Sequence, residues 1–284
     1  MKSGRLQVIL IASVALIGIL IYISPSQVNS KSKSKEENTG AVPQMNGFSP
    51  DALLKSADGA LDSTQKANLT FLEQALKLNG DKDTATLDQL GRFWDRQGIP
   101  AAAAIWFERK AEVVQSEVSF LDAAYRYFDA FKVAGDTGLR VMMVDKAIAS
   151  YTKVLEKNPE NLNAKTDLGA CYAEGTSEPM KGILLLREVV AKDPEHEMAQ
   201  LNLGMLSVKS GQLDKAIERF EKVITINPKR SEMYLYLGQV YLQKGDTAKA
   251  ITYLETFSKK SDDYQTVTQV GVMLKQLKNK AAIQ

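Results

Sequence analysis

The residue types that most often perform chemistry are scarce in this sequence of 284 residues. It contains one cysteine, Cys171, and one histidine, His196, which falls in the turn after Pro194. A single histidine disfavours a histidine-based metal site or a catalytic triad, and a single cysteine excludes an intramolecular disulfide. Ser63 and Lys66 have the spacing of a Ser/Lys hydrolase pair, but the companion motifs of that chemistry are absent.

The sequence also lacks the local motifs that hold phosphate or zinc or that activate a serine. We find no GxxxxGK[ST], no GxGxxG after a strand, no HExxH and no GxSxG. Cys171 lies beside Tyr172 at a position typical of a small packing residue, and Trp94 and Trp106 lie at or beside positions typical of a core. We therefore expect no catalytic, cofactor-binding or metal-binding residues and no enzymatic activity.

The charge and composition exclude further classes of protein. Lys and Arg number 36 against 34 Asp and Glu, a formal net charge of +2 that leaves no electrostatic footprint for nucleic acid. The hydrophobic fraction of 44% and the charged fraction of 25% are ordinary globular values. The chain is thus neither a disordered polymer nor a polytopic membrane protein.

The N-terminal region differs from this average. Residues 6–24, which follow a short tail at 1–5, read LQVILIASVALIGILIYIS and carry no charge. A helix of that length spans roughly 28 Å, close to a bilayer core. A cleavable signal peptide would have a shorter apolar run, about 7 to 15 residues, and a small-residue cleavage site, whereas Ser24-Pro25-Ser26 follows here. We expect an uncleaved transmembrane anchor, with cleavage as the alternative.

Basic residues on the two sides of this segment bear on its orientation. Lys2 and Arg5 precede it, and Lys31, Lys33 and Lys35 follow it. The preceding pair lies closer to the end of the apolar segment, which favours the N-terminus inside and the rest of the chain exported, in a periplasmic location. Because the numbers of basic residues before and after the segment are nearly balanced, the opposite orientation stays open.

A flexible basic linker is expected at 25–48, because this segment is rich in Ser, Lys, Asn, Gly and Pro and has almost no apolar periodicity. Ordered structure is expected to begin at Ser49-Pro50-Asp51. Serine can cap a helix, proline suits its first turn and aspartate complements its dipole.

Beyond the linker, the strongest pattern is self-similarity. The dipeptides Leu168-Gly169, Leu203-Gly204 and Leu237-Gly238 recur at intervals of 35 and 34 residues. Small residues in these units precede a helix-ending position by twelve residues. The repeated positions are occupied by Leu168, Gly169, Tyr172, Gly182, Pro194, Leu203, Gly204, Ala216, Phe220, Pro228, Leu237, Gly238, Tyr241 and Ala250.

Each repeated residue type has a mechanical role. The glycines and alanines suit points where two helices cross closely, and the leucines and aromatic residues fill the layer between them. Asn-Pro and Asp-Pro pairs close the second helix of a unit, because proline cannot continue the hydrogen-bond ladder and restricts the residue before it. Valine and isoleucine fall on helical spacing, so no strands are expected.

This pattern resembles the tetratricopeptide repeat, a helix-turn-helix unit of 34 residues. The resemblance implies an all-α solenoid of about five repeats over 84–262, most regular at 162–195, 196–229 and 230–262. Leading helices are expected in 49–82 and a polar capping helix in 263–284. In the unit from about Phe120 to Pro159, the spacing of Ala124 and Ala147 predicts helices lengthened by about three turns around a turn at 134–138.

In tetratricopeptide proteins the first helices of successive repeats line a concave groove that receives a peptide or helix. The implied lining here is Asn163, Thr166, Ala170, Met198, Leu201, Asn202, Met205, Glu232, Leu235, Tyr236 and Gln239. One subset of the family grips acidic C-termini with a clamp of Lys, Arg and Asn, which only Asn202 matches. The rather apolar lining instead suits an amphipathic helix, from a partner protein or from a second copy. The alternative is that much of this surface is buried between repeats.

The chain looks most like bacterial envelope tetratricopeptide proteins, which carry an N-terminal anchor. The resemblance implies a membrane-tethered protein-interaction scaffold, active in assembly or biogenesis at the cell envelope. A homo-oligomeric structural module and a cytosol-facing membrane receptor are the alternatives.

Overall fold

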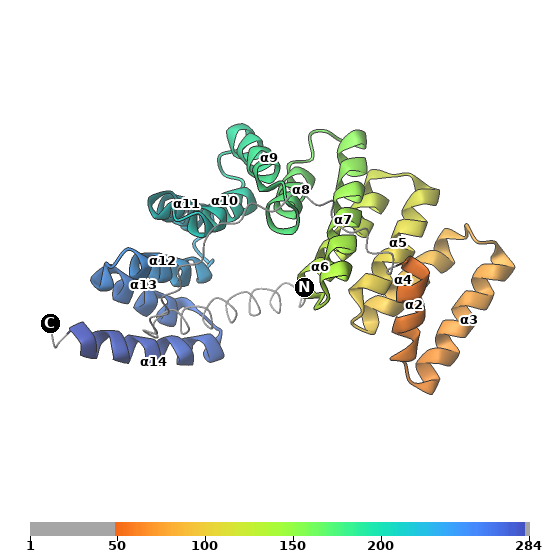
Figure 1. The fold of residues 1–284 in the computed structure, drawn as a ribbon, viewed down its shortest axis with the longest axis horizontal. Coiled ribbons are helices and arrows are strands. Elements are labelled where there is room, and N and C mark those ends of the chain that lie inside the picture. The colour runs from red at the N-terminus through yellow and green to blue at the C-terminus, as the bar shows by residue number, and fades with distance from the viewer. Residues whose placement is uncertain (1–48, 282–284) are drawn as a thin grey trace, which may run out of the picture. The chain divides into compact units, whose positions relative to one another are not determined.

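The computed structural model describes residues 49–281, and within them every regular element is a helix (Figure 1). The expected all-α class is confirmed. The helices are α2 (Pro50–Gly59), α3 (Ser63–Asn79), α4 (Thr84–Arg96), α5 (Pro100–Val114), α6 (Glu117–Val133), α7 (Thr137–Lys157), α8 (Leu162–Gly175), α9 (Pro179–Lys192), α10 (Glu197–Lys209), α11 (Leu213–Ile226), α12 (Glu232–Gln243), α13 (Thr247–Lys260) and α14 (Tyr264–Ala281).

Three expectations fall outside this range. The N-terminal tail at 1–5, the anchor at 6–24 and the linker at 25–48 lie outside the described residues. Among the residues that the structure does describe, none of the helices combines the length and the apolar character that crossing a membrane requires.

The described residues form two compact units, which we treat one at a time. The N-terminal unit extends to Asn227 and contains α2 to α11, and the C-terminal unit begins at Pro228 and contains α12 to α14. In the N-terminal unit, α4 with α5, α6 with α7, α8 with α9, and α10 with α11 form successive helical pairs. The first helices of neighbouring pairs also touch, α6 against α8 and α8 against α10. In Figure 1, α8 and α10 lie on the inner side of this unit, and α9 and α11 lie on its outer side.

Local sequence accounts for where the helices begin and end. Ser49 caps α2, accepting a hydrogen bond from the backbone N–H of Ala52, and Pro50 opens the helix. Asp62 and Gln65 form a reciprocal capping box at the start of α3. Gly211 follows α10 with φ of +73°, a left-handed conformation that lets the chain turn into α11. The helical pairs therefore have well-defined turns.

Small residues allow the paired helices to cross closely. A Cβ atom built on Gly182 would lie 2.2 Å from the carbonyl oxygen of Gly169, and one on Gly204 would lie 2.6 Å from the ring of Phe220. Ala216 and Ala250 are fully buried at the corresponding points of later pairs. Among the repeated residues, Tyr172 is half-buried, and Pro194 and Pro228 are exposed in the loops between pairs.

The pair formed by α6 and α7 is longer than its neighbours. These helices have 17 and 21 residues, against 14 each for α8 and α9, and they flank the turn at 134–138 as the spacing predicts. Ser116 and Ser119 form a capping box that starts α6.

The C-terminal unit has a core of its own. Leu235 from α12, Leu254 and Phe257 from α13, and Val270 and Leu274 from α14 pack together. The helix α14 thus covers apolar residues that α12 and α13 would otherwise expose.

Candidate functional site

Helix α10 is apolar on two faces, and only one of them is packed in the core. Ala199 and Leu203 join Leu186 and Val189 in a buried cluster between α9 and α10. On its other face, Met198 is 40% exposed, and Leu201, Asn202 and Met205 are half-buried. A helix that is apolar all round is normally enclosed. The second face of α10 therefore leaves part of its apolar surface exposed.

The α8 residues that were predicted to line the groove are more buried than those of α10. Asn163 is exposed, but Thr166 and Ala170 are buried, at 1% and 4% exposure. The Thr166 hydroxyl donates a hydrogen bond of 2.8 Å to the carbonyl oxygen of Leu162 in its own helix. Of the three α8 residues predicted to line a groove, only Asn163 has an exposed side chain.

The sole histidine connects these two helices. Nδ1 of His196 accepts the backbone N–H of Ala199 at 3.3 Å and so caps α10. Because Nδ1 accepts, Nε2 carries the hydrogen and donates to Oδ1 of Asn163 at 3.0 Å. This contact uses Oδ1 of the exposed Asn163, and its amide NH₂ remains available as a hydrogen-bond donor.

Helix α6 also has apolar residues at the surface, and the groove lining predicted from the sequence did not include them. Val118 is 68% exposed, Tyr125 is 41% exposed and Leu121 is half-buried. The frame that places Ala124 at the position of Gly169 also places these residues at the positions of Asn163, Thr166 and Ala170. The spacing of the repeats therefore indicates these residues, but the irregular length of this unit makes the correspondence hard to recognise.

Four of the predicted groove residues lie in the C-terminal unit. Leu235 belongs to its core, and Tyr236 and Gln239 are buried. Burial raises the pKa of Tyr236 to about 12. Glu232 is half-buried and accepts a hydrogen bond of 2.8 Å from Arg230. Leu235 thus acts in packing, because α13 and α14 enclose it.

Titratable groups gather where α6, α7 and α8 meet. Burial raises the pKa of Asp167 to about 6, although Lys132 opposes the shift and Tyr151 lies 3.4 Å from its carboxylate. Burial also raises the pKa of the Cys171 thiol. A thiol in that state is a poor nucleophile at neutral pH. Within residues 49–281, no group of three or more His, Cys, Asp and Glu side chains could hold a metal ion.

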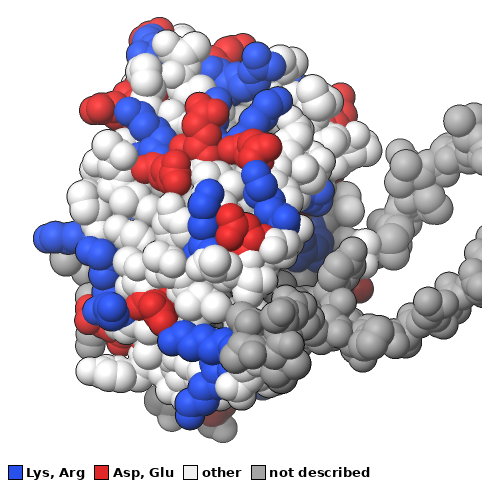
Figure 2. All heavy atoms as spheres, turned by 90° about the vertical axis from the view of Figure 1, so that its left-hand side faces the viewer, with Lys and Arg blue, Asp and Glu red and all other residues white. Residues whose placement is uncertain are grey.

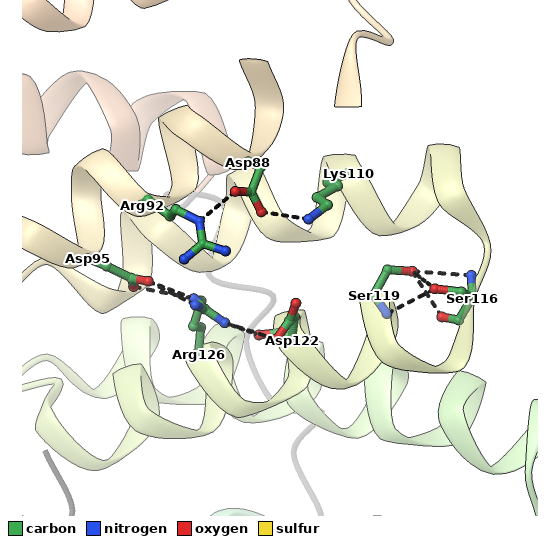
Figure 3. Close-up of polar contacts among 8 residues, drawn as sticks. All are labelled: Asp88, Arg92, Asp95, Lys110, Ser116, Ser119, Asp122 and Arg126. Atoms are coloured by element: carbon green, nitrogen blue, oxygen red, sulfur yellow. Dashed lines mark hydrogen bonds and ion pairs between the residues drawn. The ribbon is translucent and has the colours of Figure 1, made fainter. Parts of the chain in front are cut away.

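Charged residues on α4, α5 and α6 form ion pairs within and between these helices, as Figure 3 shows. Asp88 accepts from Arg92 at 2.5 Å and from Lys110 at 2.6 Å. Arg126 donates to Asp95 at 2.9 Å and lies over the ring of Phe107. These contacts tie α4, α5 and α6 together.

The face of the molecule drawn in Figure 2 carries mixed charge. On the face drawn in Figure 2, Lys and Arg alternate with Asp and Glu, and no continuous basic area lies among the described residues visible there. This agrees with the nearly neutral composition.

Parts of the chain are similar to known proteins. The family described as regulator of microtubule dynamics protein 1-3 matches residues 195–280. The BBSome complex member BBS4 of Bos taurus is 27% identical over 134 residues, which cover 45% of this chain and 24% of that protein. Cellulose synthase operon protein C of Escherichia coli K12 is 46% identical over 52 residues, 18% of this chain and 4% of that protein. The chain thus spans a quarter or less of these two relatives.

Solved structures show the fold. A tetratricopeptide repeat protein from Parabacteroides merdae aligns with a TM-score of 0.57 and 18% identity, covering 81% of this chain and 87% of that chain. PilW, described as a type IV pilus biogenesis factor, aligns with a TM-score of 0.55 and 19% identity, covering 70% and 87%. Together with the paired helices and their 34-residue spacing, these likenesses make the chain a tetratricopeptide-like repeat protein.

Proposed function

We propose that this chain is a protein-interaction scaffold that binds an amphipathic helix or peptide against the inner faces of α6, α8 and α10. The observation that carries the proposal is the second apolar face of α10, where Met198 is exposed and Leu201 and Met205 are half-buried outside the core cluster. Methionine side chains are flexible and polarisable, so such a face adapts to an apolar partner surface. Tyr125 of α6 and the amide NH₂ of the exposed Asn163 supply an aromatic contact and a hydrogen-bond donor.

The test is capture of partners from native membranes with the full chain. Met205→Glu places a charge in the proposed contact, and we expect it to reduce capture by tenfold or more while the helical circular dichroism spectrum is unchanged. Met180→Glu is the matched control, because Met180 is 61% exposed on α9, the outer helix of its pair. The same partners at the same yield with Met205→Glu would contradict the proposal.

We further propose that the scaffold is tethered to a membrane through residues 6–24 with its repeats exported, and that it binds rather than catalyses. The support is the uncharged nineteen-residue segment and the scarcity of catalytic residue types in the sequence. Protease added outside intact spheroplasts should digest the repeats. Protection of the repeats, with digestion only after lysis, would instead favour a cytosol-facing receptor.

A further inference from the structure

A cleft opens between α2 and α3 in the N-terminal unit. The helix α2 packs on α5 and α3 packs on α4, so α4 and α5 form the floor of the cleft and α2 and α3 form its two walls. In Figure 1, α2 and α3 diverge from the short turn that joins them. The volume of about 360 Å³ lies at the lower end of the roughly 300–1,000 Å³ of ligand pockets. The cleft is therefore large enough for a short segment of a ligand.

The floor of the cleft contains both tryptophans of the sequence. Trp94 of α4 is 1% exposed and Trp106 of α5 is 5% exposed, and both line the cleft. An indole Nε1–H can only donate a hydrogen bond, and neither of these two atoms has an acceptor among the described residues. Buried donors are normally paired, because removal from water without a partner is costly. The floor therefore offers two hydrogen-bond donors to a group that enters the cleft.

Arg109, which also lines the cleft, is engaged within the protein. Its guanidinium lies over the Trp106 ring, 4.4 Å from the ring centroid, and donates a hydrogen bond of 3.0 Å to Oδ1 of Asp51. The cation–π contact and the ion pair hold Arg109 against the floor. Because this guanidinium is already paired with a carboxylate, the cleft is poorly suited to an anionic ligand.

The two walls carry carboxylates that form no ion pair with another described residue. Asp58 of α2 is half-buried, and Glu73 of α3 is exposed on the opposite wall. Lys55 of α2 adds one positive charge to these two negative charges. The three side chains sum to one negative charge, so the walls attract a cationic group rather than an anion.

We propose that this cleft binds a segment of a basic peptide, which lies along the floor between α2 and α3. Its carbonyl oxygens accept hydrogen bonds from Trp94 and Trp106, and its Lys or Arg side chains pair with Asp58 and Glu73. A basic peptide supplies both groups that the cleft calls for, a hydrogen-bond acceptor and a cation. The cleft is separate from the inner faces of α8 and α10, so this proposal goes beyond the proposed function and can fail independently of it.

Intrinsic tryptophan fluorescence of the purified full chain in detergent tests the proposal, because both tryptophans of the sequence line the cleft. The probe is acetyl-Gly-Lys-Gly-amide, which carries carbonyl groups and one ammonium group. It should shift the emission to longer wavelength in a saturable way. The matched peptide acetyl-Gly-Glu-Gly-amide should give no saturable shift. Butylamine, which has the ammonium group without carbonyls, should bind at least tenfold more weakly.

Substitutions in the walls separate this site from non-specific binding. Asp58→Asn with Glu73→Gln should raise the dissociation constant of the lysine peptide at least tenfold. The circular dichroism spectrum should be unchanged, because neither carboxylate has an ion pair to lose among the described residues. Glu156→Gln, at an exposed position of α7, is the control and should bind as the wild type does.

Nuclear magnetic resonance of the isotope-labelled full chain tests the floor without a substitution. The two indole N–H resonances should both move downfield as the lysine peptide binds, because each N–H gains an acceptor. Equal affinity for the lysine and glutamate peptides, no saturable response to the lysine peptide, or unchanged affinity in the double wall variant would overturn the proposal. Saturation without movement of the indole resonances would also overturn it.

Discussion

At the scale of single residues, the crossing of α8 and α9 depends on the absence of side chains at two glycines. A Cβ on Gly182 would lie 2.2 Å from the carbonyl oxygen of Gly169 and 2.7 Å from the backbone nitrogen of Ala173, and backbone atoms cannot move aside as a flexible side chain can. We expect Gly182→Ala to lower the free energy of unfolding by about 1–3 kcal/mol, measured by urea denaturation, despite the better helix propensity of alanine. Gly59→Ala is the control in the same unit, because nothing lies within 4 Å of its Cβ. Equal stability of the two variants would contradict the close crossing.

Asp167 provides a second test at this scale. Burial raises the pKa of its carboxyl from 3.8 to about 6, so the ionised side chain destabilises the folded state above pH 6 and the penalty fades as pH falls towards 4. Asp167→Asn should therefore be more stable than the wild type at pH 8, by roughly 1–3 kcal/mol. At pH 4 the gain should fall to about a fifth of its value at pH 8, because the carboxyl is then almost fully protonated in the folded chain and partly protonated in the unfolded chain. Urea denaturation at both pH values measures this, and a gain independent of pH would show that ionisation is not its cause.

At the scale of elements, the two faces of α10 are expected to have different roles, one in packing the core and the other in binding a partner. Leu203 is 7% exposed in the cluster with Leu186, whereas Met205 is half-buried on the other face. Leu203→Ala should cost about 2–5 kcal/mol of unfolding free energy, and Met205→Ala should cost less than about 1 kcal/mol. Thermal denaturation monitored by circular dichroism compares them. Similar losses for the two substitutions would place Met205 in the core and remove the proposed contact face.

The elements also show what sequence can predict. The 34-residue spacing was enough to predict the repeat fold, because close helix crossings require small residues such as glycine and because proline ends a helix. Burial within the inner face was harder to foresee. Thr166 is buried with its hydroxyl bonded inside its own helix, and Leu235 is buried because α13 and α14 pack on it. The role of His196 as a helix cap bonded to Asn163 depends on the spatial approach of α8 and α10, which no local pattern contains.

At the scale of the whole molecule, repeats contact only their neighbours, so damage in one unit should stay local. Ending the chain after Asp262 removes α14 and exposes Leu235 and Leu254. We expect hydrogen exchange in α12 and α13 to accelerate at least tenfold in this variant, while α4 to α9 keep their protection. Loss of protection throughout residues 50–226 would contradict independent units.

The central claim is that the inner face of α8 and α10 binds a partner protein. The most direct measurement is site-specific photocross-linking in native membranes, with a photoreactive phenylalanine analogue at Met205 and, as the matched position, at Met180 on α9. The account predicts a discrete cross-linked partner at Met205 that is absent at Met180. The same products at both positions, or none at Met205 while Met180 cross-links, would contradict it.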